Sequence, residues 1–192
     1  MGQGQLSFDD VSCQRGGRML FEKLGFTLEP GDAAIVSGPN GVGKSSLLRL
    51  AAGLLAPVSG KIRRTGRLAL ADEALALDRQ LSLAKALQFW GDIDGGSVRD
   101  ALAAVALDHL GQVPVRILST GQRKRAVLAR VIASGADVWL LDEPGNGLDL
   151  ASLKTLATVI SDHRFRGGIV LAASHQPLGI EGAIDIRLEA KG

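Results

Sequence analysis

A glycine-rich stretch with one lysine and one serine is the strongest chemical signal in the sequence. Residues 38–45 read Gly-Pro-Asn-Gly-Val-Gly-Lys-Ser and match the pattern G-x-x-x-x-G-K-[ST] at every fixed position. Glycines let the backbone direct its N–H groups at phosphate oxygens, the lysine adds a full charge near the β- and γ-phosphates, and the serine hydroxyl is a ligand for Mg²⁺. The alternative is a plain glycine turn with a solvated lysine. The residues assigned to phosphate binding are Gly38, Pro39, Asn40, Gly41, Val42, Gly43, Lys44, Ser45 and Ser46, with Lys44 also catalytic and Ser45 also a metal ligand.

Two carboxylates follow a run of four apolar residues. The run at 138–141, Val-Trp-Leu-Leu, is typical of a buried strand, and Asp142 and Glu143 come directly after it. Ligands of open α/β sheets bind at the carboxyl ends of the strands, so Asp142 is expected beside the phosphate loop, where it would hold Mg²⁺ directly or through water. Glu143 would orient and polarise an attacking water molecule. The alternative is two acids in a turn, but a second carboxylate favours hydrolysis over binding alone.

The elements that must position these residues alternate along the chain. Apolar runs predict buried strands at 33–37, 138–141 and 169–173, and more exposed strands at 5–12, 26–28 and 184–188. Helical spacing appears at 45–52, 81–90, 97–111, 122–134 and 150–162, and the Gly and Pro residues of 56–66 predict a turn and a hairpin. Strands that alternate with helices predict an α/β fold with a mainly parallel sheet and helices on both faces.

Further segments extend the pattern in a fixed order. Leu-Ser-Thr-Gly-Gln at 118–122 resembles the LSGGQ signature of ATP-binding cassette (ABC) ATPases, and 138–144 resembles their Walker B strand. Residues 147–149 and 174–175 resemble the D-loop and the H-loop of the same family. The resemblance covers essentially the whole chain. It implies one P-loop NTPase domain over 1–192, with an antiparallel β edge and a short helical arm at about 72–130 that includes the signature segment.

The resemblance also assigns roles to these segments. It places His175 at the γ-phosphate as a third catalytic residue with Glu143 and Lys44, whereas His109 and His163 receive no role. In this family the signature segment of one subunit closes on the ATP that another subunit holds, so the expected assembly is a homodimer with two ATP molecules at one twofold interface. The signature and D-loop residues assigned to this contact are Ser119, Gly121, Gln122 and Asp149. Helix caps are the alternative for Ser119 and Asp149.

Two positions depart from the family pattern. Most ABC domains stack an aromatic residue on adenine about 23 residues before the phosphate loop, but this position is Arg15 and the chain contains no Tyr. A planar guanidinium can stack on a base, so Arg15 is the candidate, with a solvated Arg15 as the alternative. The family's Q-loop glutamine is also missing. Glu73 lies nearest to its place and is a candidate metal ligand, whereas Gln80 lies too far along the chain.

Within the ABC family, the sequence is similar to the haem-exporter ATPases of cytochrome c maturation. Ser-His-Gln-Pro-Leu at 174–178 resembles their THQPL segment, and 45–54 resembles their TSLLRLLTGL segment. The similarity implies a peripheral ATPase on the cytoplasmic face of a bacterial inner membrane, with ATP and Mg²⁺ as ligands. Its partners would be the membrane subunits CcmB and CcmC, and the energy would drive release of the haem-loaded chaperone CcmE.

Composition excludes several other classes. The net charge is only +2, from 22 basic and 20 acidic residues, so bulk charge gives no reason to expect nucleic-acid binding. One cysteine, Cys13, excludes a disulfide framework and indicates a reducing compartment. No uninterrupted apolar run of transmembrane length is present, and the first ten residues lack the pattern of a signal peptide.

Other functions within the fold remain as alternatives. One is a soluble ABC ATPase: DNA-repair types need a long coiled-coil insertion and translation types need two cassettes, which leaves an Fe–S-assembly type. The other is a non-hydrolysing regulatory subunit, which Glu143 and His175 argue against but the unusual Q-loop leaves open.

Overall fold

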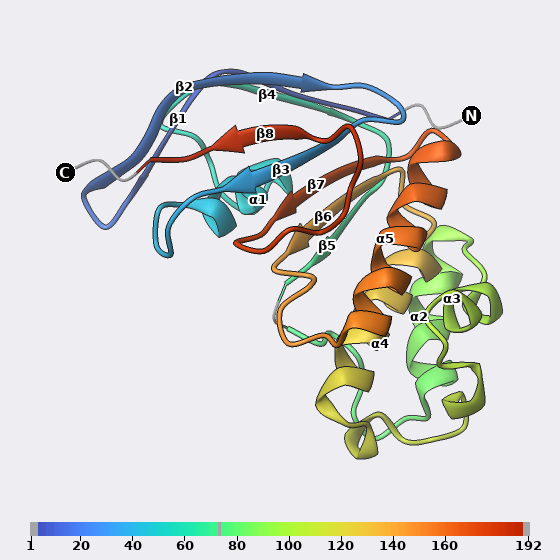
Figure 1. Ribbon diagram of the computed structural model, residues 1–192. Coiled ribbons are helices and arrows are strands. Elements are labelled where there is room, and N and C mark those ends of the chain that lie inside the picture. The colour runs from blue at the N-terminus through green and yellow to red at the C-terminus, as the bar shows by residue number, and fades with distance from the viewer. Residues whose placement is uncertain (1–3, 73, 190–192) are drawn as a thin grey trace.

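The chain begins with three strands, continues through helices and further strands, and has its last described strand at Ile184–Arg187 (Figure 1). The structure is a computed structural model that describes residues 4–72 and 74–189. Its strands are β1 (Gln5–Arg15), β2 (Arg18–Leu28), β3 (Ala33–Ser37), β4 (Ser59–Thr65), β5 (Leu68–Ala71), β6 (Val138–Asp142), β7 (Ile169–Ala173) and β8 (Ile184–Arg187). Its helices are α1 (Lys44–Ala51), α2 (Leu83–Asp94), α3 (Val98–Ala104), α4 (Thr120–Ala133) and α5 (Leu150–Phe165), with 3₁₀ turns at Asp108–Leu110 and Val115–Ile117.

Five parallel strands form the central sheet, in the order β5-β6-β7-β3-β8. Both faces of the sheet are buried. Along β6, Val138 and Leu140 join one apolar cluster, whereas Trp139 and Leu141 join the other. A strand that is buried on both faces needs no polar alternation, which explains the continuous apolar runs of β6 and β7. The prediction of an α/β fold with a mainly parallel sheet is confirmed.

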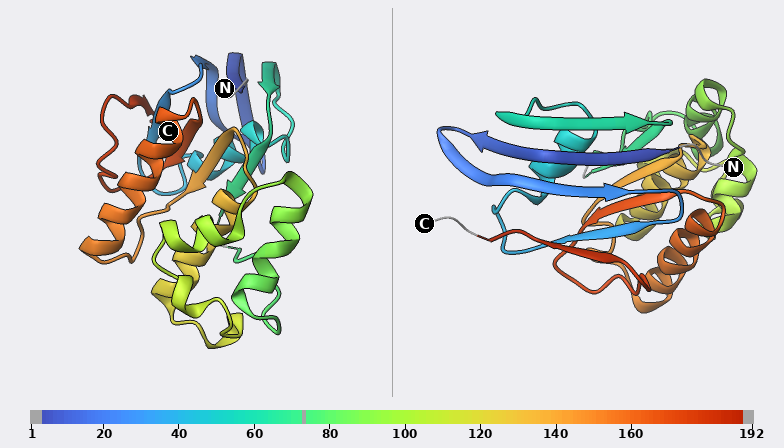
Figure 2. Two further views of the ribbon diagram at one scale, coloured as in Figure 1. Left: turned by 90° about the vertical axis from the view of Figure 1, so that its right-hand side faces the viewer. Right: turned by 90° about the horizontal axis from the view of Figure 1, so that it is seen from above.

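Different layers cover the two faces of this sheet. On one face, α1 packs between the sheet and the antiparallel strands β2-β1-β4, with Leu47 and Leu48 of α1 and Leu6 of β1 in the same core. On the other face lie α4 and α5, through residues such as Ala129 and Leu156, with α2 and α3 farther out. Figure 2 shows the antiparallel strands on one side of the parallel strands and the helices α2 to α5 on the other. The antiparallel β edge is therefore a full covering layer.

The predicted hairpin at 56–66 is wrong. β4 pairs with β1 in the antiparallel sheet, whereas β5 runs parallel to β6 in the central sheet. The chain leaves one sheet for the other at Gly66, whose φ is 84°. The turn residues predicted the change of direction correctly, but the strand partners lie far away in the sequence, and local composition carries no information about them.

The single helix predicted at 97–111 is also wrong. α3 ends at Ala104, and Ala106 has a left-handed φ of 53°. Arg125 of α4 donates hydrogen bonds to the carbonyl oxygens of Val105 (3.1 Å) and Ala106 (3.3 Å). A tertiary contact therefore satisfies the end of α3, and the apolar spacing that continues to Gly111 belongs to a 3₁₀ turn.

Candidate active site

The phosphate loop connects β3 to α1. Gly43 is the N-cap residue of α1 with a φ of 119°, which an L side chain rarely adopts. The helix therefore begins at Lys44, and its first N–H groups face the loop. Lys44 is only 6% exposed, and its Nζ donates hydrogen bonds to the carbonyl oxygens of Gly38 (2.9 Å) and Pro39 (3.3 Å). The loop and its ammonium group thus form one compact positively charged concavity.

The strand order brings two more segments to this loop. β7 lies between β6 and β3, so the carboxyl ends of the three strands are neighbours. Glu143 directly follows β6 and His175 lies two residues after β7, while the phosphate loop follows β3. The strand order therefore brings Glu143 and His175 to the edge of the sheet that carries the phosphate loop.

Glu143 contacts both of the other predicted catalytic residues. Its Oε1 lies 3.8 Å from Lys44 Nζ, and its Oε2 lies 2.7 Å from His175 Nδ1. Its backbone is left-handed, with a φ of 48°, and its N–H donates to the carbonyl oxygen of Ala173 (2.9 Å). A non-glycine residue held in this conformation is often found at a functional site, because the surrounding structure must impose it. Here the bond to β7 imposes it and aims the carboxylate at the loop.

The hydrogen bonds of His175 indicate which ring nitrogen carries the hydrogen. A carboxylate only accepts, so Nδ1 donates to Glu143. The other ring nitrogen, Nε2, lies 3.3 Å from the side-chain amide nitrogen of Gln176 and accepts from it. Gln176 was not among the predicted site residues, although it directly follows His175. It favours the Nδ1–H form of the ring, which is the form that can donate to Glu143.

Asp142 and Ser45 form the second polar cluster of the site. Asp142 ends β6, Ser45 lies in the first turn of α1, and their side chains are hydrogen-bonded to each other. Burial raises the pKa of Asp142, the bond from Ser45 opposes the shift, and the negative charge of Glu143 adds to it. Burial makes the ionised form of this carboxylate unfavourable, and a bound cation would stabilise it. A carboxylate beside a hydroxyl oxygen is a set of ligands that a hard cation such as Mg²⁺ prefers.

One cleft of about 510 Å³ contains Lys44, Ser45, Glu143 and His175, whereas Asp142 lines a second cavity described below. Its lining includes the catalytic candidates and several residues of the phosphate loop, and Arg15 reaches it from the end of β1. Leu20 and Asn146 also line it and were not predicted, because neither residue type carries a chemical signal in the sequence. The lining residues are Arg15, Leu20, Asn40, Gly41, Gly43, Lys44, Ser45, Ser46, Glu143, Asn146 and His175.

The signature residues do not join this cleft. Ser119 is the N-cap of α4, where its hydroxyl accepts from Gln122 N (3.2 Å) and its own N–H donates to Gln122 Oε1 (2.8 Å). This reciprocal pair is a capping box. Gly121 lies in the first turn, and a Cβ built there would meet nothing within 4 Å among the described atoms, so the helix end is open to a partner.

Asp149 and Glu73 have different outcomes. Asp149 caps α5 by accepting from Ser152 N at 2.8 Å, and it does not line the cleft. The alternative assignment of Asp149 as a helix cap is therefore confirmed. Its role in a contact between two chains stays a prediction. Glu73, the candidate for the Q-loop position, lies outside the described residues.

A second cavity, of about 490 Å³, lies between α4, α5 and the end of β6. Asp72 lines it together with Asp142 and Glu143. The charge of Asp72 also contributes to raising the pKa of Asp142, after the effects of burial and the nearer groups. Asp72 is thus an acidic neighbour of the site that sequence reasoning missed, because Glu73 beside it was closer to the expected position.

Comparison with known proteins agrees with this geometry. Residues 21–146 match the ABC transporter family. The cytochrome c biogenesis ATP-binding export protein CcmA of Zymomonas mobilis is 55% identical over 190 residues, which cover 98% of this chain and 86% of that protein. The chain belongs to the CcmA family of ABC transporter ATPases. The CcmA protein of Sphingopyxis alaskensis is 55% identical over 178 residues, 91% of this chain and 92% of that protein.

Solved structures show the same fold. A metal-chelate type ABC transporter in an inward-facing conformation superposes with a TM-score of 0.83 at 28% identity, over 98% of this chain and 80% of that chain. As a member of the CcmA family, the chain is an ATP-binding and ATP-hydrolysing transporter subunit of cytochrome c biogenesis. ABC ATPases act in pairs with membrane permease subunits. Within the described part of the chain, no helix is long and apolar enough to cross a membrane.

Proposed function

We propose that the 510 Å³ cleft binds ATP with Mg²⁺ and hydrolyses it. The backbone N–H groups of the phosphate loop and Lys44 would hold the β- and γ-phosphates. Ser45 and Asp142 would hold the metal ion, which when bound neutralises charge on the phosphate oxygens. Arg15 would stack on the adenine. The placement of Arg15 in the same cleft as the phosphate loop supports this last assignment.

The convergence of Glu143, His175 and Lys44 is the observation that carries the proposal. Glu143 would accept a hydrogen bond from a water molecule and orient it for attack on the γ-phosphorus, while the bond to the departing ADP oxygen breaks. His175 would hold the Glu143 carboxylate through its Nδ1–H, and the 2.7 Å distance supports this role. A carboxylate with two fixed neighbours is a preorganised base, because little reorganisation is needed at the moment of reaction.

The site would be completed by a second copy of the chain. Ser119, Gly121 and Gln122 lie at an open helix N-terminus outside the cleft of their own chain, and such an end attracts phosphate. A twofold arrangement would place each signature helix on the ATP of its partner, with Asp149 in the contact between them. The chain would thus work as a single ATPase domain over 1–192, active as a homodimer.

The similarity to CcmA proteins supports a proposal about the wider assembly. We propose that this pair binds membrane subunits similar to CcmB and CcmC on the cytoplasmic face of a bacterial inner membrane, and that the cargo pathway is haem export for cytochrome c maturation. Identity of 55% to CcmA proteins supports this assignment over an Fe–S-assembly ATPase.

Co-purification tests the assembly. The tagged chain, expressed in a cell that makes cytochrome c and extracted in mild detergent, should bring down a polytopic membrane protein in a fixed ratio. The variant Lys44→Ala should do the same, because it alters the nucleotide cleft alone. A set of partners that contains only soluble proteins would contradict the exporter assignment.

A further inference from the structure

Two side-chain hydrogen bonds hold the chain at the end of β5 and in the segment that follows this strand. Where it leaves β5, the carbonyl oxygen of Leu70 accepts a hydrogen bond from Arg130 Nη2 at 2.6 Å. Six residues later, the carbonyl oxygen of Ala76 accepts from Trp90 Nε1 at 3.2 Å. Ala76 itself has a left-handed φ of 48°, so the backbone is sharply turned at the second anchor.

The two side chains that donate these hydrogen bonds, Arg130 and Trp90, also contact each other. The guanidinium carbon of Arg130 lies 4.9 Å from the centre of the Trp90 ring, within the range of a cation–π contact. Arg130 belongs to α4 and is 5% exposed, whereas Trp90 belongs to α2. The pair therefore locks the helices α2 and α4 to each other and ties both of them to the edge strand β5.

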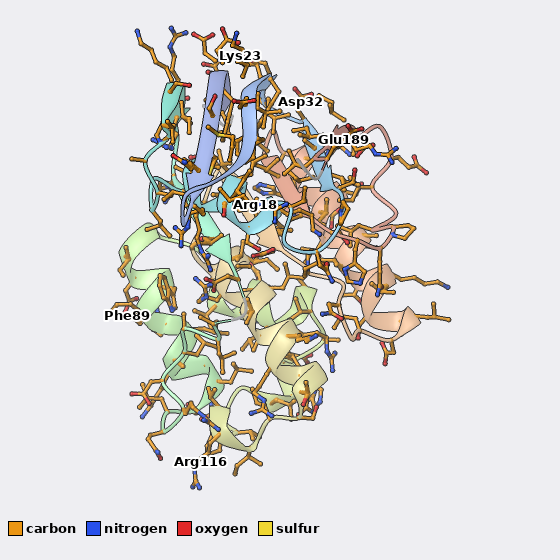
Figure 3. All side chains as sticks on the ribbon, turned by 90° about the vertical axis from the view of Figure 1, so that its left-hand side faces the viewer. Arg18, Lys23, Asp32, Phe89, Arg116 and Glu189 are labelled. Atoms are coloured by element: carbon orange, nitrogen blue, oxygen red, sulfur yellow. The ribbon has the colours of Figure 1, made fainter. Side chains whose placement is uncertain are left out.

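An exposed aromatic residue extends the pair to the surface. Phe89 packs edge-on against Trp90, with ring centres 5.4 Å apart and an angle of 90° between the rings. Phe89 is 61% exposed. Figure 3 shows Phe89 on the outer side of the helical region and Arg116 at the far end of that region. A displacement of α2 at the surface would thus act on Trp90 and Arg130 directly.

The segment that the pair holds carries a charge next to the catalytic edge. Asp72 lies between the two anchors, and its charge acts on Arg130 as well as on Asp142. Asp72 also lines the cavity that Asp142 and Glu143 border. A change in the position of Asp72 would therefore change the electric field at the end of β6.

We propose that Arg130 and Trp90 form a positioning pair that couples movement of the helices α2 and α4 to Asp72 and, through Asp72, to the carboxylates at the end of β6. The pair touches neither the phosphate loop nor the nucleotide cleft, so its effect is on coupling and not on ATP affinity. The proposal rests on the proposed function, because it assigns the coupling to a membrane partner that acts on the helices.

The test compares the ATP turnover of the isolated chain with that of the detergent-purified complex with its membrane subunits. Trp90→Phe keeps an aromatic ring under Arg130 and deletes the N–H that reaches Ala76. We expect it to reduce the stimulation by the membrane subunits at least fivefold, while the KM for ATP of the isolated chain stays within twofold. Arg130→Met should have the same effect, Arg130→Lys should restore part of the stimulation, and the control Trp139→Phe should leave it unchanged.

The ratio of the two turnovers separates positioning from folding. A role in folding alone would lower the turnover of the isolated chain and the complex by the same factor, and that result would overturn the proposal. Full stimulation in both Trp90→Phe and Arg130→Met would overturn it as well.

A second measurement needs no membrane partner. The chain has two tryptophans, so Trp139→Phe leaves Trp90 as the only one. Addition of ATP and Mg²⁺ to this variant should change the Trp90 emission, and Arg130→Met should abolish the change. If ATP binds, as measured with a fluorescent analogue, but leaves the emission unaltered, the pair does not respond to the site. If instead the emission responds and wild-type turnover is never stimulated by the membrane subunits, the exporter assignment fails and the pair stands.

Discussion

The Nδ1 atom of His175 lies 2.7 Å from Oε2 of Glu143, although 31 residues separate the two in the sequence. The pair spans the ends of β6 and β7, and the backbone bond from Glu143 to Ala173 fixes its register. Loss of the imidazole would remove the hydrogen bond to Oε2 and leave the Glu143 carboxylate with Lys44, 3.8 Å from its Oε1, as its ion-pair partner. The two residues are therefore expected to act as one unit.

Changes to this unit should affect turnover and not binding. Glu143→Gln removes the base and His175→Ala removes its support, so each should lower kcat by about 10²-fold or more with little change in the KM for ATP. The double variant should be hardly slower than either single variant, because residues that act as a unit are non-additive. Steady-state phosphate release measures this. Effects that multiply in the double variant would show that the two act independently.

Asp142 should cost stability when no cation is present. Its pKa is raised in the folded state, mainly by burial, so the folded chain binds more protons than the unfolded chain between the ordinary carboxyl value of 3.8 and the raised folded value. Stability therefore falls as the pH rises through that window, and the loss is complete above it. At pH 7 without Mg²⁺, Asp142→Asn should raise the Tm while it abolishes hydrolysis. The exposed Asp162→Asn is the control, and a lower Tm for Asp142→Asn would contradict the assignment.

Arg15 should contribute to nucleotide affinity. If its guanidinium stacks on the base, Arg15→Ala should raise the KM for ATP about 3- to 10-fold with kcat unchanged, as expected for the loss of a cation–π contact. Arg15→Trp should restore the affinity, because a ring can stack in the same place. Lys23→Ala, on the same antiparallel sheet, serves as the control. An unchanged KM in Arg15→Ala would indicate that the base is held by other groups.

His163 should make stability depend on pH. Its ring stacks on Trp139 with centres 3.7 Å apart, and burial lowers its pKa from 6.5 to about 4. The folded chain thus binds fewer protons than the unfolded chain between about pH 4 and 6.5, so this residue's contribution is complete above pH 6.5 and is lost as the pH falls towards 4. The loss is at most about 3 kcal/mol.

Denaturant unfolding at pH 7.5 and pH 5 measures this contribution. His163→Phe keeps the stacked ring and removes the titration, so its stability should fall less between the two pH values than that of the wild type. His109→Phe, at an exposed 3₁₀ turn, should keep the wild-type dependence. Equal pH dependence in His163→Phe and the wild type would show that His163 ionises as easily in the folded chain as in the unfolded one.

The parts of the site that follow from local sequence were predictable. The phosphate loop has a fixed spacing because its backbone must wrap an anion, and Asp142 and Glu143 were placed by the apolar strand before them. The positions that escaped prediction depend on tertiary contacts. The pairing of β4 with β1 and the contact of Arg125 with the end of α3 join segments that lie far apart in the sequence. The site neighbours Asp72, Asn146 and Gln176 carry no sequence signal of their own.

The pairing of Arg130 with Trp90 illustrates the same limit. Arg130 occurs in a basic, helical segment whose spacing predicts only a helix, and Trp90 ends another helical pattern. Their contact depends on how α2 and α4 pack, and periodicity within each helix does not determine this packing.

ATP-dependent pairing of the Glu143→Gln variant tests the central claim, that two chains complete one hydrolytic site. With ATP and Mg²⁺ the variant should elute and scatter light as a particle of twice the mass of one chain, and with ADP it should return to one chain. Adding Ser119→Arg, which places bulk and charge at the signature helix N-terminus, should prevent the pairing while ATP still binds. A variant that binds ATP and Mg²⁺ fully and remains a single chain in every condition would contradict the account.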